Sequence, residues 1–166
     1  ASLSAWGIPL MKNAVVVGSG SFGTALAVAL ADRGLDVKLW GRNAEVAEEI
    51  NTKHTNQAYL PDVKLHHGVV ATTDLACCQD ADLLVVAIPS KHFRSVCEQV
   101  RDAGLAKDCV TLSCTKGMEL ATGKRMTEVL DEVFPENTSA VLSGPSHAEE
   151  MARNMATALV IGCKDE

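Results

Sequence analysis

The chain has 166 residues, in which 15 lysines and arginines stand against 21 aspartates and glutamates, for a formal net charge of −6. A hydrophobic fraction of 47% and a charged fraction of 22% are ordinary for a globular domain and exclude collagen, coiled coil and disorder. The acidic balance and the 4% aromatic content argue against a nucleic-acid partner, which needs a basic, base-stacking face. Apolar runs of about six residues fall short of the roughly 20 that span a bilayer, so no membrane insertion is expected.

Short apolar runs alternate with helical periods along the chain, and a long loop is predicted at residues 53–68. The predicted strands cover residues 13–17, 36–40, 69–72, 82–88, 109–114, 139–143 and 157–162. The predicted helices cover residues 21–34, 43–52, 74–78, 91–103, 122–134 and 145–153. Asn43 is expected as an N-cap, and Pro145 as the first residue of the last helix. This alternation predicts an α/β fold with a doubly wound, mostly parallel sheet of the Rossmann type, which binds its ligand at the carboxyl ends of the strands.

The length suits a single domain, which we place at residues 11–166. Met11 directly precedes the first predicted strand, so residues 1–10 are interpreted as a leader or an expression remnant. The six cysteines include no Cys-x-x-Cys pair, which favours reduced, buried thiols and a cytoplasmic location. The adjacent pair Cys77-Cys78 is an alternative redox site, but no residue spacing supports it, and no metal site is expected.

A glycine-rich loop follows the first predicted strand and opens an alanine-rich helix, which is the context that gives its G-x-G-x-x-G pattern meaning. Gly18 permits the tight turn, Gly20 lets a pyrophosphate approach the backbone, and Gly23 lets the helix pack closely on the strand. The N–H groups at the start of the helix would then bind phosphates. The loop predicts a dinucleotide site.

The end of the second predicted strand bears on the choice of cofactor. An NAD site usually has a carboxylate here for the ribose 2′-OH, but Asp36 comes too early and Glu45 lies already in the next helix. Arg42 could instead pair with a 2′-phosphate and stack on the adenine. The sequence therefore favours NADP over NAD, with a merely solvated Arg42 as the alternative.

The ends of three further strands carry candidate ligand-binding residues. Pro89 could contact the cofactor from its position alone. Lys116 could reach into the cleft and favour negative charge on a substrate oxygen, although a solvated lysine would look the same. The segment from Ser143 begins a strand–turn–helix unit suited to an anion or polar substrate. His147 in this segment is interpreted as a helix-surface histidine rather than a general acid.

Six segments, in this order and spacing, resemble the NAD(P)-dependent glycerol-3-phosphate dehydrogenases, and more closely their prokaryotic-type branch, which commonly favours NADPH. They are GSGSFGTALA (18–27), LWGRN (39–43), NQAYLP (56–61), AIPS (87–90), TKGME (115–119) and SGPSHAEE (143–150). The resemblance implies reversible hydride transfer between the nicotinamide and dihydroxyacetone phosphate. The product, sn-glycerol 3-phosphate, would supply phospholipid synthesis.

The resemblance also implies roles for individual residues. Those implied as cofactor contacts are Ser21, Phe22, Arg42, Asn43, Tyr59, Lys116 and Ala148. Those implied as substrate contacts are Lys116, Gly144 and Ser146. Cys114-Thr115 precede Lys116 where the family often has a serine directly before the lysine, and threonine keeps that hydroxyl.

The family's second, all-helical domain, which carries the proton-transferring lysine and an Arg-Asn pair for the phosphate, would follow the last predicted strand. The chain stops there, at Glu166, so we expect no catalytic residue in it. We expect NADPH binding with little or no turnover. Apolar side chains near the last strand would favour self-association, and a homodimer is one form that this could take.

Two alternative hypotheses about the function are also consistent with the sequence. The chain could be the cofactor domain of another two-domain dehydrogenase of the ketopantoate or sugar-acid type, against which the segments around Lys116 and Gly144 speak. It could also be a non-catalytic dinucleotide sensor, which would have no need of substrate-side residues.

Overall fold

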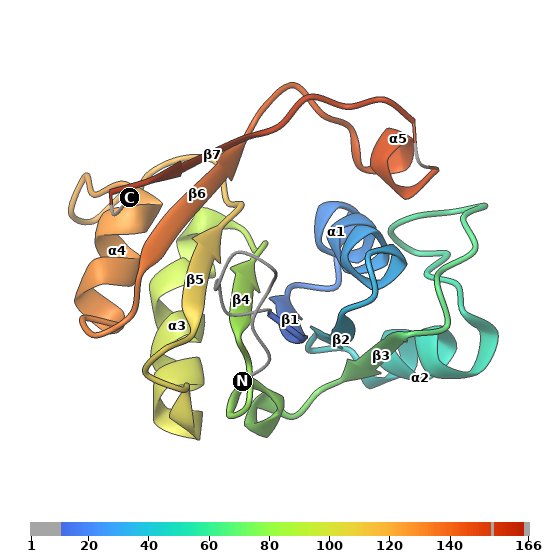
Figure 1. The fold of residues 1–166 in the computed structure, drawn as a ribbon, viewed down its shortest axis with the longest axis horizontal. Helices are drawn as coiled ribbons and strands as arrows, with labels where there is room; N and C mark the ends of the chain where they lie inside the picture. Colours follow the sequence, from blue (N-terminus) through green and yellow to red (C-terminus); the bar gives the residue numbers. More distant parts are fainter. Residues whose placement is uncertain (1–10, 154, 165–166) are drawn as a thin grey trace, which may run out of the picture.

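The computed structural model describes residues 11–153 and 155–164, and the interpretation of residues 1–10 lies outside these ranges. A single sheet runs through the molecule in the strand order β3-β2-β1-β4-β5-β6-β7 (Figure 1). The strands are β1 (Asn13–Val17), β2 (Asp36–Trp40), β3 (Val69–Thr72), β4 (Leu83–Val86), β5 (Val110–Ser113), β6 (Ser139–Ser143) and β7 (Val160–Cys163). The chain starts in the centre of the sheet, winds outward to β3, and then returns to the other side of β1.

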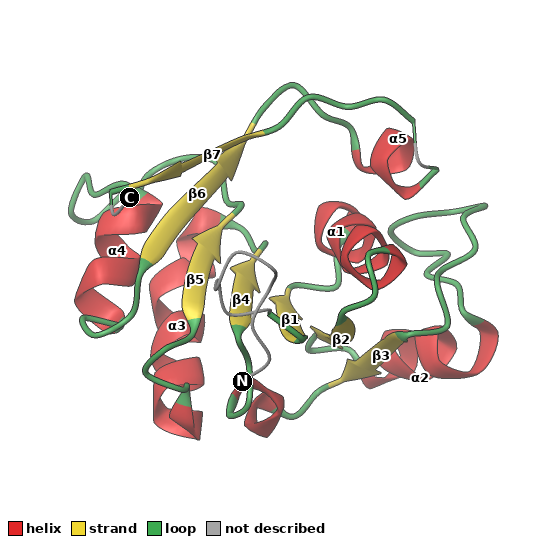
Figure 2. Cartoon of the chain, viewed as in Figure 1, coloured by secondary structure: helices red, strands yellow, loops and turns green. Residues whose placement is uncertain are grey.

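The helices cover both faces of this sheet (Figure 2). They are α1 (Ser21–Asp32), α2 (Ala44–Lys53), α3 (Phe93–Gly104), α4 (Met126–Val133) and α5 (Ala148–Ala152), with short 3₁₀ turns η1 (Leu75–Cys78) and η2 (Ser90–His92). One core lies under α1, α2 and α5, and a second lies under α3, α4 and η1. Buried valines of β1 alternate between them, with Val16 in the first and Val15 and Val17 in the second.

The first six strands are parallel, and the doubly wound fold predicted from the sequence is confirmed. The last strand differs from the rest, because β7 pairs with β6 in the antiparallel sense. Among the described residues between β6 and β7, the one helix is the short α5, which packs back onto α1 and does not cross over the sheet. A parallel return would require a crossover connection there.

Two predicted helices begin a full turn or nearly a full turn later than expected. The helix predicted at 122–134 begins at Met126, because residues 117–125 fold into a turn closed by a backbone bridge between Met118 and Arg125. The helix predicted at 145–153 begins at Ala148, so Pro145 is not its first residue. Gly144 takes a φ of +155° and the Ser146 N–H donates to its carbonyl at 3.1 Å, which makes this segment a tight turn.

All six cysteines are free thiols, and four of them are buried. Burial raises the pKa of Cys97, Cys109 and Cys114 to about 12, which keeps these thiols protonated. Cys77 is half-buried and Cys163 is exposed, contrary to the expectation of buried thiols; Cys163 lies on the edge strand β7, all of whose residues are exposed. Among the described residues, no helix is long and apolar enough to cross a membrane.

Candidate dinucleotide and substrate site

The glycine loop between β1 and α1 is built by close backbone contacts. Gly18 has a φ of +122°, and a Cβ there would lie 2.3 Å from the carbonyl oxygen of Ala87. A Cβ on Gly23 would lie 1.9 Å from the carbonyl oxygen of Gly18, so the first turn of α1 can pack against the loop only with glycine at this position. The two positions hold the start of α1 against the carboxyl ends of β1 and β4.

Gly20 differs from both of these glycines. It is the N-cap of α1 with an ordinary φ of −73°, and a Cβ there would meet no atom within 4 Å. Its missing side chain therefore leaves open space beside the free N–H groups of the first helical turn. This is the arrangement that lets a phosphate approach the backbone.

A cavity of about 290 Å³ lies in front of this loop. It is lined by Gly18, Ser19, Gly20, Trp40, Gly41, Arg42, Asn43, Tyr59, Ala87, Ile88 and Pro89. The loops after β1, β2 and β4 therefore meet at one place, as the sheet topology requires. Of the predicted cofactor residues, Gly18, Gly20, Arg42, Asn43, Tyr59 and Pro89 line this cavity.

Arg42 and Asn43 are both exposed at the end of β2. The Oδ1 of Asn43 accepts hydrogen bonds from the N–H groups of Glu45 at 2.9 Å and Val46 at 3.4 Å, so the predicted N-cap of α2 is confirmed. This leaves its amide NH₂ as the group that could reach a ligand. Arg42 lines the cavity and makes no ion pair with another described residue, so its charge is free for a ligand.

The Tyr59 loop is held over the start of α1. The Ser21 hydroxyl donates to the Tyr59 carbonyl, which links the first residue of the helix to the loop. Asn56, a residue that the sequence reasoning missed as a site residue, is fully buried below the glycine loop. Its amide donates to the Ser19 carbonyl at 3.0 Å and to the Thr24 hydroxyl at 2.9 Å, and so it fixes the loop from beneath.

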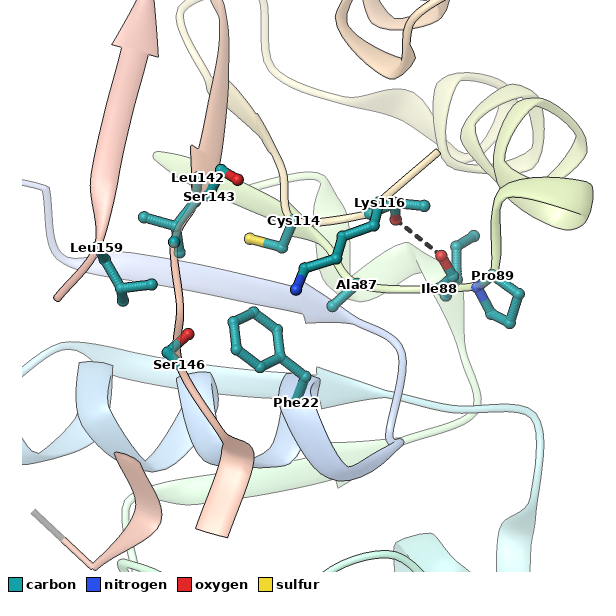
Figure 3. Close-up of a pocket in the computed structure, with 12 residues that line it drawn as sticks. Phe22, Ala87, Ile88, Pro89, Cys114, Lys116, Leu142, Ser143, Ser146 and Leu159 are labelled. Atoms are coloured by element: carbon teal, nitrogen blue, oxygen red, sulfur yellow. Dashed lines mark hydrogen bonds between the residues drawn. The ribbon is translucent and has the colours of Figure 1, made fainter. Parts of the chain in front are cut away.

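A second cavity, of about 260 Å³, lies on the other side of the β4 loop (Figure 3). It is lined by Phe22, Ala87, Ile88, Pro89, Cys114, Thr115, Lys116, Leu142, Ser143, Gly144, Ser146 and Leu159. Its walls are mostly apolar, which suits a planar ring, and its polar groups are few. Residues 87–89 line both cavities, so the two form neighbouring parts of one cleft along the carboxyl edge of the sheet.

Lys116 extends across the second cavity, and its amine lies between the Phe22 ring and the Cys114 sulfur in Figure 3. The residue before it, Thr115, is anchored by a hydrogen bond that its hydroxyl donates to the Ile88 carbonyl at 2.7 Å. Lys116 is the one charged side chain among the described residues that line this cavity. The side chain is thus placed to hold negative charge or to donate a hydrogen bond there.

Gly144 and Ser146 form the far wall of the same cavity, with the Ser146 side chain towards Phe22 in Figure 3. The expected cluster of helix N–H groups starting at Pro145 is not formed, because residues 144–147 are a turn and α5 has only five residues. The predicted contacts of Gly144 and Ser146 would therefore come from the turn itself. Ala148 begins α5, packs against the first core and does not line either cavity.

The family model of the NAD-dependent glycerol-3-phosphate dehydrogenase N-terminus matches residues 13–166. The chain belongs to this family. Among its curated relatives, the glycerol-3-phosphate dehydrogenase [NAD(P)+] of Parvibaculum lavamentivorans is 43% identical over 155 residues, or 93% of this chain and 46% of that protein. The enzyme of the same name from Streptomyces griseus is 46% identical over 159 residues, with the same shares covered.

A crystal structure of the glycerol-3-phosphate dehydrogenase from Coxiella burnetii matches with a TM-score of 0.86 at 28% identity, over 95% of this chain and 48% of that one. The glycerol-3-phosphate dehydrogenase family predicted from the sequence is therefore confirmed, and the ketopantoate and sugar-acid alternatives are set aside. The chain spans about half the length of the curated relatives that it matches. It corresponds to the N-terminal, nucleotide-binding half of a glycerol-3-phosphate dehydrogenase.

Proposed function

We propose that this chain is the NADP(H)-binding half of an enzyme that reversibly reduces dihydroxyacetone phosphate to sn-glycerol 3-phosphate, which would feed phospholipid synthesis. The observation that supports this most is the shared wall at residues 87–89, because the glycine loop and the lysine-bearing apolar cavity then belong to one cleft. Such a cleft suits a dinucleotide, whose charged diphosphate joins the adenine nucleoside to the flat nicotinamide nucleoside. The free thiols and the family suit a reducing compartment such as the cytoplasm.

The glycine loop and the carboxyl end of β2 would bind the cofactor. The backbone N–H groups of Ser21 and Phe22 at the start of α1 would hold the pyrophosphate above Gly20. Arg42 would pair with the 2′-phosphate through its planar guanidinium, with the Asn43 amide beside it. Tyr59 would cover the open side of this site, which its loop already overhangs.

The second cavity would hold the nicotinamide ring and the substrate. The chemistry that a bound dinucleotide supplies there is hydride transfer to or from the substrate carbon. Phe22 and the apolar wall would exclude water, and Lys116 would stabilise charge on the substrate oxygen or phosphate. Gly144 and Ser146 would orient the substrate from the opposite wall.

Lys116 carries a single positive charge, which cannot balance both the phosphate dianion and the charge that develops on the carbonyl oxygen of the substrate. We therefore propose that the 166-residue chain alone binds NADPH without measurable turnover of dihydroxyacetone phosphate. The remaining groups would come from the other half of a full-length relative. NADPH oxidation by the purified chain at a rate comparable to that of a full-length relative would refute this division of labour.

The cofactor assignment is tested by titrating NADPH and NADH into the 166-residue chain and following the nicotinamide fluorescence. We expect NADPH to bind more tightly than NADH, and Arg42→Ala to weaken NADPH binding about tenfold, the usual effect of losing one charge-assisted contact. The same variant should leave the NADH affinity within about twofold, because NADH has no phosphate at that position.

Arg101→Ala is the matched control, because Arg101 is an exposed arginine near the end of α3 that pairs with Asp102 and lines neither cavity. It should change neither affinity. Equal affinities for NADPH and NADH, unchanged in Arg42→Ala, would overturn the NADP assignment while leaving dinucleotide binding intact. No binding of either nucleotide would overturn the proposed function as a whole.

A further inference from the structure

The loop that carries Lys116 is long and mostly exposed, yet it is tied down at both ends. On one side Thr115 bonds the β4 loop through the Ile88 carbonyl. On the other side the chain passes through Gly117, at a φ of +109°, into the turn that closes between Met118 and Arg125. Lys116 thus lies between two segments that are each held by hydrogen bonds to neighbouring parts of the fold.

Glu119 ties the second of these segments to α3. Its carboxylate accepts two hydrogen bonds from Arg94 on α3, at 2.7 Å from Nε and 3.0 Å from Nη2. Its side chain is only 15% exposed, and it also accepts a hydrogen bond from the Thr122 hydroxyl within the turn. The bidentate pairing fixes both the distance and the orientation of the turn relative to α3.

Arg94 joins this turn to a third element. Its Nη2 also pairs with Glu132 on α4 at 2.7 Å, and Lys124 from the turn pairs with the other oxygen of Glu132. The network therefore links α3, α4 and the turn through side chains that lie outside both cavities. Arg94 and its hydrogen bonds lower the pKa of Glu119 to about 2, so the carboxylate is charged throughout the neutral range.

We propose that Glu119, held by Arg94, is a positioning residue that sets the place of Lys116 in the cleft. The proposal rests on the role proposed above for Lys116 and adds to it a residue three positions away that lines neither cavity. Gly117 makes this coupling necessary, because a glycine with a positive φ between Lys116 and the turn gives the loop little stiffness of its own.

The first arm of the test needs no cofactor. The rate at which acetic anhydride acetylates Lys116 is measured by peptide mass spectrometry, with the 80% exposed Lys107 in the same sample as a reference. In the unmodified chain the amine of Lys116 lies over the cavity, so it should react more slowly than that of Lys107. In Glu119→Gln the relative rate should rise by about threefold, because the loop would open more often.

The second arm is a double-mutant cycle on NADPH affinity, using Glu119→Gln, Lys116→Met and the combined variant. Each single substitution should weaken binding by about fivefold, and the combined variant should bind no more weakly than Lys116→Met alone. Asp102→Asn, the same carboxylate-to-amide change in the exposed Arg101–Asp102 pair, is the matched control and should alter neither arm. Arg94→Lys keeps the positive charge but loses the bidentate pairing, so it should give intermediate effects in both arms. It takes the place of Glu119→Gln if that variant proves unstable.

The two arms separate the possible failures. An unchanged acetylation rate in both Glu119→Gln and Arg94→Lys overturns the positioning proposal, whatever the affinities are. Additive losses of affinity in the cycle overturn it as well, because Glu119 would then act independently of Lys116. A raised acetylation rate with unchanged NADPH affinity in all variants supports the positioning and overturns the proposed role of Lys116 in binding the cofactor.

Discussion

At the scale of single residues, the glycine loop contains two glycines that are needed for opposite reasons. Gly20 faces open space at the N-cap of α1, where serine is a favoured residue. We predict that Gly20→Ser keeps the free energy of unfolding within about 0.5 kcal/mol. The same change should weaken NADPH binding at least about tenfold, because the new side chain fills the space of the phosphates.

Gly23→Ala is the matched comparison, because it adds only one methyl group. Its Cβ would lie 1.9 Å from the Gly18 carbonyl oxygen, so we expect a loss of more than about 2 kcal/mol of stability from overpacking. Urea unfolding and NADPH titration of the two variants measure both quantities. A normal affinity in Gly20→Ser, or a normal stability in Gly23→Ala, would contradict this division of roles.

The same loop shows which parts of the site the sequence could predict. Gly18, Gly20 and Gly23 act through contacts within or next to their own turn, so their spacing was enough to predict a dinucleotide loop. Asn56 acts across 37 residues on the Ser19 carbonyl, and no local pattern carries that information. The Arg94–Glu119 pair, 25 residues apart, is equally invisible without the fold.

At the scale of elements, strands were predicted more accurately than helix starts. Strands β1, β2, β3 and β6 have the predicted bounds, because β-branched runs between polar residues mark both ends. The starts of α4 and α5 were wrong, because each depends on a preceding turn that tertiary contacts stabilise. The antiparallel β7 was missed for a similar reason, since α5 docks on α1 and leaves no crossover.

One carboxylate joins the amino ends of two central strands. Asp82, just before β4, accepts hydrogen bonds from the N–H groups of Asn13 at 2.9 Å and Lys12 at 2.7 Å, and these bonds lower its pKa. A lowered pKa in the folded state means that the stabilisation is present above the ordinary value of about 3.9 and is lost as the pH falls through the folded value.

We therefore predict that Asp82→Asn lowers the free energy of unfolding by about 1 kcal/mol at neutral pH, because an amide oxygen is a weaker acceptor than a carboxylate. The difference between this variant and the unmodified chain should stay constant in the neutral range and disappear in acid. Urea unfolding of both proteins across pH gives the measurement. A difference that persists below the folded pKa of Asp82 would show that the carboxylate charge is not its source.

At the scale of the whole molecule, the two edges of the sheet differ in how they are protected against pairing with another strand. At the β3 edge, the Asn51 side chain on α2 donates to the Ala71 carbonyl at 2.9 Å and accepts from the Ala71 N–H at 2.8 Å, which blocks strand addition. At the β7 edge, all four residues are exposed, and among the described residues no further strand pairs with it. Val160 and Ile161 on this strand are 70% and 66% exposed.

An unprotected edge strand with large apolar side chains is a template for pairing with a second chain. We predict that the 166-residue chain associates with itself through β7 as its concentration rises, and that Ile161→Lys keeps it monomeric, because a lysine on an edge strand opposes pairing. Sedimentation velocity over a wide concentration range measures the association.

Leu120→Lys is the control, since Leu120 is 94% exposed but lies in the turn after Lys116. This variant should associate as the unmodified chain does. Association that persists in Ile161→Lys and is lost in Leu120→Lys would instead place the contact at the turn near the cleft, where it would compete with the cofactor for access.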